Sequence, residues 1–185
     1  MRNLKSAMVI GLLMVAAGCI RSLHPIYTDE DLVFEQSLIG VWADDESSEV
    51  WDFSTEGTNS YKLVYTDDSG KKGTFSAHLL RINGFLFIDF FPKKPELEEN
   101  DFYEGHLLSV HTFVYLKQIE PTLQMSFASS DWLKDLLKED PGAIGHEIID
   151  SEIILTAQTE KLQAFWLEHL HAEGAFNEFS NMTRR

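Results

Sequence analysis

The stretch TFSAHLLRINGFLFIDFF, residues 74–91, decides the fold. It contains two strand-like runs, 74–82 and 85–91, and the dipeptide Asn83-Gly84 lies between them. Asn-Gly at this position predicts a two-residue β-hairpin, because a type I′ turn needs positive φ at both central residues. A two-residue loop also fixes the register of the two strands. The predicted opposite pairs are Ile82 with Phe85, Leu80 with Phe87, and His78 with Asp89.

Both faces of this hairpin carry apolar side chains. Opposite residues in an antiparallel pair lie on the same side of the sheet. One face therefore collects Thr74, Ser76, His78, Leu80, Ile82, Phe85, Phe87, Asp89 and Phe91, and the other collects Phe75, Ala77, Leu79, Arg81, Leu86, Ile88 and Phe90. A strand that is apolar on both sides is typical of a sheet covered on both faces. We expect a barrel wall packed on its outside by a helix.

Further strand-like segments lie on both sides of the hairpin. They are residues 38–42, 49–54 and 61–65 before it, and 107–117, 123–127 and 147–155 after it. Helical spacing of apolar residues predicts a short helix over 131–138, capped by Ser130, and a last helix that ends near Ala172. Many short strands with turn signals favour a sandwich or small barrel. The predicted fold of residues 37–185 is therefore mainly β: a single antiparallel β-barrel or strongly curved sheet, with one inserted short helix and a C-terminal helix.

The first eighteen residues have the composition of an export signal. Arg2 and Lys5 supply a basic head, and residues 7–17 form an apolar run. A cleavable signal needs such a head, about 7–15 apolar residues and small residues before the cut. The run is shorter than the roughly 18 apolar residues of a spanning helix. The sequence therefore predicts a signal peptide over residues 1–18.

The single cysteine of the chain is Cys19, directly after Val15-Ala16-Ala17-Gly18. This arrangement resembles the lipobox of bacterial lipoproteins, although Ala16 stands where the family usually has a larger aliphatic residue. The resemblance implies that Cys19 becomes the diacylated first residue and that this lipid attaches the protein to a membrane. Since Ile20 is not an aspartate, the resemblance further implies the outer membrane, on its periplasmic side, in a host with two membranes. Residues 19–36 are then expected to form a lipidated tether.

Leu38-Ile39-Gly40-Val41-Trp42 resembles the G-x-W signature at the first strand of lipocalin-like barrels. In that architecture the tryptophan plugs one end of the barrel. The run from Ser22 to Trp42 also resembles the start of a family of uncharacterised bacterial lipoproteins, and this resemblance implies no activity.

Charge and composition exclude several classes of partner. Without Arg2 and Lys5 the chain has 13 basic against 30 acidic residues, a formal net charge of −17. Such a surface repels phosphate backbones, so we expect no nucleic-acid partner. The sequence contains no glycine-rich phosphate loop, no calcium loop of the D-x-D-x-D-G type and no H-E-x-x-H motif. We therefore expect no cofactor and no metal.

Five residues are candidates for contact with a ligand. They are Trp42, His78, Phe87, Asp89 and His111. His78 and Asp89 are predicted to face each other, and aromatic residues with a few polar groups are typical of a pocket for an apolar ligand.

Three functions follow from these observations. The first is binding of a small apolar or amphipathic ligand without catalysis. The second is a structural or protein-interaction module of the cell envelope, whose barrel is filled by its own side chains. The third, less favoured, is a hydrolase that uses His78, Asp89 and a nucleophile elsewhere in the chain, because a carboxylate that orients an imidazole is half of an acid–base arrangement. The sequence favours a protein without catalytic activity but does not decide this.

Overall fold

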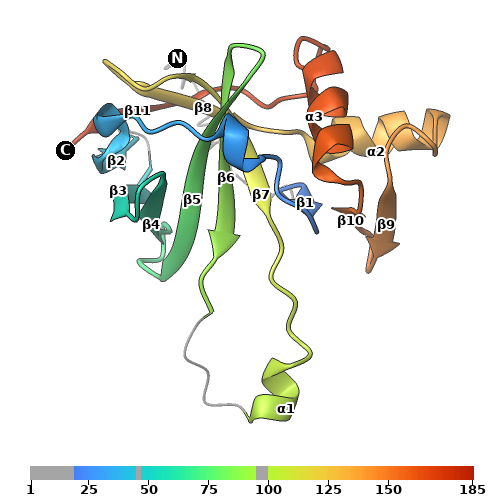
Figure 1. The fold of residues 1–185 in the computed structure, drawn as a ribbon, viewed down its shortest axis with the longest axis horizontal. Helices are drawn as coiled ribbons and strands as arrows, with labels where there is room; N and C mark the ends of the chain where they lie inside the picture. Colours follow the sequence, from blue (N-terminus) through green and yellow to red (C-terminus); the bar gives the residue numbers. More distant parts are fainter. Residues whose placement is uncertain (1–18, 45–46, 95–99) are drawn as a thin grey trace, which may run out of the picture.

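Eight antiparallel strands close into a barrel in the computed structural model, which describes residues 19–44, 47–94 and 100–185 (Figure 1). The predicted signal peptide lies outside the described residues. The barrel strands are β2 (Gly40–Ala43), β3 (Val50–Glu56), β4 (Ser60–Thr66), β5 (Lys72–Ile82), β6 (Phe85–Pro92), β7 (Thr112–Gln118), β8 (Leu123–Phe127) and β11 (Ser180–Arg184). Each strand pairs with the next, and β11 closes the barrel between β8 and β2. The predicted fold class, a mainly β antiparallel barrel, is confirmed.

The β5–β6 hairpin has the predicted turn and register. Asn83 and Gly84 both have positive φ, 49° and 89°. The paired residues include Ile82 with Phe85, Leu80 with Phe87, and His78 with Asp89.

The two faces of this hairpin contribute to two separate apolar cores. The interior core draws at least one residue from every barrel strand, including Trp42, Phe53, Tyr61, Leu79 and Ile88. The outer core combines Leu80, Ile82, Phe87 and Phe113 of β5–β7 with residues from the helices and the N-terminal segment. The expectation of a barrel wall covered on its outside is therefore confirmed.

Two helices supply part of this outer cover, and both lie on one side of the barrel (Figure 1). Helix α2 (Ser130–Glu139) matches the predicted short helix, but its N-cap is Ser129, whose hydroxyl accepts from Trp132 N at 3.3 Å. Helix α3 (Thr159–Glu168) is shorter than predicted and follows Gln158. Its Trp166 packs on Phe113 of β7, with 5.3 Å between the ring centroids.

The predicted strand over residues 147–155 does not belong to the barrel. Asp150 and Ser151 have φ of 51° and 70°, so they turn the chain between β9 (His146–Ile149) and β10 (Glu152–Leu155). These strands form a small separate sheet together with β1 (Arg21–Ser22). Strand β11 closes the barrel instead, and no strand is predicted there from the sequence. Its sequence Ser-Asn-Met-Thr-Arg has one apolar residue and therefore no alternating apolar pattern.

The N-terminal segment, residues 20–36, is docked on the barrel, which corrects the expectation of a free tether. Strand β1 pairs in parallel with β10, and Ile26 is completely buried in the outer core. Leu32 bridges to Leu80 of β5. Two short 3-10 helices, Asp29–Asp31 and Gln36–Leu38, lie before and after Leu32. The segment gains these contacts because its apolar residues cover the outer face of β5–β7.

Between β6 and β7 the chain leaves the barrel in a long excursion, whose described residues are 93–94 and 100–111. It carries the short helix α1 (Asp101–Glu104) and stands clear of the other elements in Figure 1. The strand predicted over 107–117 begins only at Thr112. Leu107 and Leu108, which were expected in it, are exposed and belong to the excursion. Within the described ranges, no helix combines the length and the apolar character that crossing a bilayer requires.

Candidate functional site

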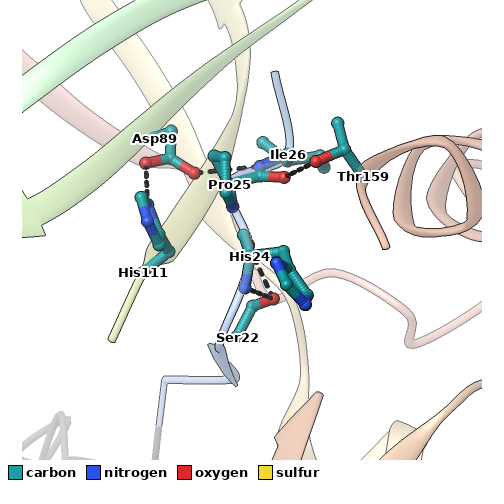
Figure 2. Close-up of polar contacts among 7 residues, drawn as sticks. All are labelled: Ser22, His24, Pro25, Ile26, Asp89, His111 and Thr159. Atoms are coloured by element: carbon teal, nitrogen blue, oxygen red, sulfur yellow. Dashed lines mark hydrogen bonds and ion pairs between the residues drawn. The ribbon is translucent and has the colours of Figure 1, made fainter. Parts of the chain in front are cut away.

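A buried carboxylate, Asp89 of β6, is the centre of a polar group on the outer barrel wall (Figure 2). Its position follows from the hairpin register, which places it on the outer face opposite His78, and it is 0% exposed. An ionised carboxylate in such a place needs hydrogen-bond partners, because burial of an unpaired charge is costly. The structure provides one partner for each carboxylate oxygen.

The two partners of Asp89 come from different parts of the chain. Oδ1 lies 2.7 Å from Nδ1 of His111, two residues before the paired residue Phe113 on β7. Because an ionised carboxylate only accepts, Nδ1 of His111 is the protonated nitrogen in this contact. Oδ2 accepts the backbone N–H of Ile26 at 3.1 Å. Asp89 of β6 therefore joins the residue that precedes β7 to the N-terminal segment.

His78 faces Asp89 as predicted, but no hydrogen bond joins the two side chains. It lies opposite Asp89 in the register, but both carboxylate oxygens bind other groups, as above. The ring of Tyr27 stacks on the His78 ring with 4.6 Å between centroids, and Nδ1 of His78 is buried without a hydrogen-bond partner. The predicted register pair His78–Asp89 is therefore present, whereas the imidazole that binds the carboxylate is that of His111.

The surroundings of His78 favour its neutral form. Burial lowers the pKa of His78 below its ordinary value, the charge of Asp89 opposes this shift, and His111 adds to it. Burial and the charges of Asp89 and Asp29 raise the pKa of Tyr27. The group thus contains a buried carboxylate, a bound imidazole and a neutral imidazole packed under a phenol.

Helix α3 holds the N-terminal segment from the other side. The Thr159 hydroxyl donates to Pro25 O at 2.8 Å, and Gln163 Nε2 donates to Ile26 O at 2.9 Å and to Asp31 Oδ2 at 2.7 Å. Figure 2 shows Pro25 and Ile26 between Asp89 and the start of this helix. The polar groups here fasten the segment between barrel and helix, which is a structural task.

Trp42 lies in the other core and shares no site with these residues. It is completely buried in the barrel interior, and its Nε1 donates to Leu38 O at 2.9 Å. The Arg184 guanidinium lies 4.5 Å from the Trp42 ring centroid. Phe87 is buried in the outer core. The structure therefore brings together His78, Asp89 and His111 and leaves Trp42 on the opposite side of the barrel wall.

The barrel interior is filled by side chains. Leu38, Trp42, Tyr61, Leu79 and Ile88 are completely buried and pack in one cluster inside the barrel. The hollow that reaches Trp51, Met125 and Met182 at the barrel mouth holds about 40 Å³. That volume is far below the ~300 Å³ at which ligand pockets begin. A larger, open groove of about 320 Å³ lies outside the barrel, lined among others by Tyr115, Phe176 and Phe179.

The polar group lacks the arrangement of an acid–base nucleophile. The Ser22 hydroxyl donates to His24 O at 2.7 Å, and the Ser76 hydroxyl donates to Glu56 Oε2 at 3.0 Å. In residues 19–44, 47–94 and 100–185, no hydrogen bond joins a hydroxyl to the ring of His78 or His111, although covalent catalysis needs a base beside its nucleophile. The same ranges contain no group of three or more His, Cys, Asp or Glu side chains placed to hold a metal ion.

The sequence carries no signal for the partners of Asp89. The β5–β6 register follows from a two-residue turn, but nineteen residues separate β6 from β7 and set no register. The contact with Ile26 joins residues 63 positions apart.

Comparisons with protein-family models, with curated proteins and with solved structures find no significant match.

Proposed function

We propose that this chain is an exported lipoprotein, attached to a membrane through lipid on Cys19, that serves as a structural or protein-interaction module of the cell envelope. In a host with two membranes it belongs to the outer membrane, on the periplasmic side. The module acts without catalysis. Its filled barrel is a rigid body on which the anchored N-terminal segment is docked.

The packed barrel interior is the observation that carries this proposal. A protein that stores a small apolar ligand inside its barrel needs an open cavity, whereas Trp42, Tyr61 and Phe53 are at most 1% exposed within the interior core. The sequence-based preference for a ligand in the barrel therefore gives way to the filled-barrel alternative. The hydroxyl contacts described above likewise favour a protein that is not a hydrolase.

The outer groove supports a second candidate, binding of a small amphipathic ligand outside the barrel. Its volume of about 320 Å³ reaches the lower limit for ligand pockets. Tyr115, Phe176 and Phe179 line it together with Lys117, whose Nζ lies 5.4 Å from the Phe179 ring centroid. An apolar wall with one cation fits an amphipathic anion.

The experiment replaces the only cysteine, Cys19→Ser, in the full chain expressed in a bacterial host fed a labelled fatty acid. We expect the unchanged chain to be labelled and to sediment with membranes. The variant should be unlabelled and released into the soluble exported fraction, because a thiol is needed for the thioether. If the variant stays membrane-bound through high-salt washes, the anchor is not at Cys19.

Native mass spectrometry of the released variant provides the second readout of the same experiment. The mass of the bare polypeptide is expected for a filled module. Reproducible recovery of a small amphipathic molecule, lost on Phe176→Ser but not on Phe34→Ser, would replace the module by the groove-binding candidate.

A further inference from the structure

The most exposed apolar side chains outside the two cores lie on two segments, the excursion between β6 and β7 and the β9–β10 hairpin. Phe102 and Leu108 of the excursion are 79% and 75% exposed, and Leu107 is 53% exposed. Ile148 and Ile149, at the turn end of the β9–β10 hairpin, are 64% and 54% exposed. We call these five residues the apolar tip. Figure 1, viewed down the shortest axis, shows the excursion and this turn directed to the same side.

Cys19 enters the fold beside this apolar tip. Three residues after it, Ser22 exchanges two backbone hydrogen bonds with His111, the last residue of the excursion, at 2.9 and 2.8 Å. Arg21 and Ser22 pair in parallel with Ile154 and Leu155, so the preceding residues run back towards the β9–β10 turn. Three residues span at most about 10 Å. Cys19 is therefore close to the base of both elements of the tip.

We propose that the apolar tip inserts into the interfacial layer of the bilayer to which Cys19 is anchored. This inference rests on the proposed lipid at Cys19, which fixes one end of the molecule next to the headgroups. Exposed aromatic and aliphatic side chains bind at that depth, and their binding strength scales with the apolar area buried there. The tip thereby adds several membrane contacts to the single lipid attachment point and sets the orientation of the barrel.

The charges near the tip favour apolar insertion into the membrane over electrostatic attraction to it. The two lysines at the start of the excursion, Lys93 and Lys94, form ion pairs with Glu56 and Glu104. The hairpin turn carries Asp150 and Glu152, and the chain as a whole is strongly acidic. Lysines neutralised in this way offer little attraction to anionic headgroups. The tip should therefore enter bilayers of zwitterionic lipids, which have no net charge, and high salt should not release it.

The experiment uses Cys19 as the only thiol of the mature chain, residues 19–185. The thiol is coupled to a maleimide lipid in phosphatidylcholine vesicles, which sets the anchor irrespective of whether cells lipidate it. Phe102→Trp places a fluorophore on the tip, and Leu108→Trp is a second reporter. Phe34→Trp, at a residue that stacks on Tyr61 away from the tip, is the matched control.

Brominated acyl chains in these vesicles should quench the emission added by Phe102→Trp and Leu108→Trp, by about half, and leave that of Phe34→Trp unchanged. Raising the salt concentration to about 0.5 M should not reverse the quenching, because screening weakens only charge interactions. Absence of quenching, equal quenching of the control, or dimerisation of the lipid-free chain through the tip would each overturn the proposal. Failure of fatty-acid labelling at Cys19 in cells would contradict only the anchor.

Discussion

At the scale of single residues, the buried polar groups differ in whether they have hydrogen-bond partners. Asp89 has a partner for each oxygen, in Ile26 and His111. His78, directly opposite Asp89 on the adjacent strand, lacks such a partner: its Nδ1 is buried without a hydrogen bond beneath Tyr27. A buried polar atom without a partner costs about 1–3 kcal/mol. His78 is therefore a place where the outer core is less stable than it could be.

Replacing this side chain, His78→Phe, should raise the free energy of unfolding by about 1 kcal/mol at neutral pH, because the unpaired nitrogen is lost and the stack on Tyr27 remains. The variant should also change the pH dependence. The folded state lowers the pKa of His78 below its ordinary value of 6.5, so the unfolded chain binds the proton more readily. Stability from neutral His78 is complete above pH 6.5 and declines as the pH falls below it.

Denaturant unfolding of both chains between about pH 7.5 and 5.5 measures this difference, with the neighbouring groups Asp89, His111 and Tyr27 unchanged. The advantage of His78→Phe should widen as the pH falls. His171→Gln, which removes an exposed histidine, serves as the control and should run parallel to the unchanged chain. A constant gap between His78→Phe and the unchanged chain would show that His78 titrates normally in the folded state.

At the scale of elements, closure of the barrel depends on the contact between β2 and β11. Gly40 has a φ of 139°, a conformation open to glycine, and a Cβ built on it would lie 2.7 Å from Arg184 Nη1. Arg184 donates to Ile39 O and Ser37 O, each at 2.5 Å, and covers the Trp42 ring. The G-x-W pattern thus has a physical basis: glycine admits the arginine that covers the tryptophan.

The substitution Gly40→Ala should destabilise the chain by about 2 kcal/mol, through backbone strain and displacement of Arg184. Adding Arg184→Ala should cost less in this background than alone, because the first change already displaces the guanidinium. Thermal unfolding of the four chains of this cycle gives the coupling. Gly142→Ala, at a glycine without positive φ, should change stability by less than about 0.5 kcal/mol. Additive effects would mean that Gly40 and Arg184 act independently.

At the scale of the whole molecule, the N-terminal segment connects three parts of the fold. It pairs with the small sheet through β1, buries Ile26 in the outer core and accepts hydrogen bonds from α3. A lipid on Cys19 would therefore be joined to the body of the protein with little slack. The roughly 60 Å of reach that a free tether of this length would have is not available to the docked segment.

A chain that begins at residue 37 should lose at least about 4 kcal/mol of unfolding free energy relative to one that begins at residue 19, since Ile20 and Ile26 are both buried. Should the shorter chain fail to fold, Ile26→Ala in the longer chain gives the same information, with an expected cost of about 3 kcal/mol. Denaturant unfolding measures both. If the two chains were equally stable and Ile26→Ala left the free energy of unfolding unchanged, residues 19–36 would be a tether that does not stabilise the fold.

The sequence by itself determined the features that depend on neighbours in the chain. Asn83-Gly84 set the hairpin register, the period-two pattern assigned Leu79 and Leu80 to opposite faces, and apolar spacing located α2. Only the tertiary structure decided which distant segments meet. β11 joins the barrel although its sequence lacks an apolar pattern, and Asp89 binds His111 and Ile26 across long separations. Turn chemistry and side-chain periodicity act over a few residues, whereas closure, docking and filling of the interior depend on packing among segments whose separation in sequence carries no register.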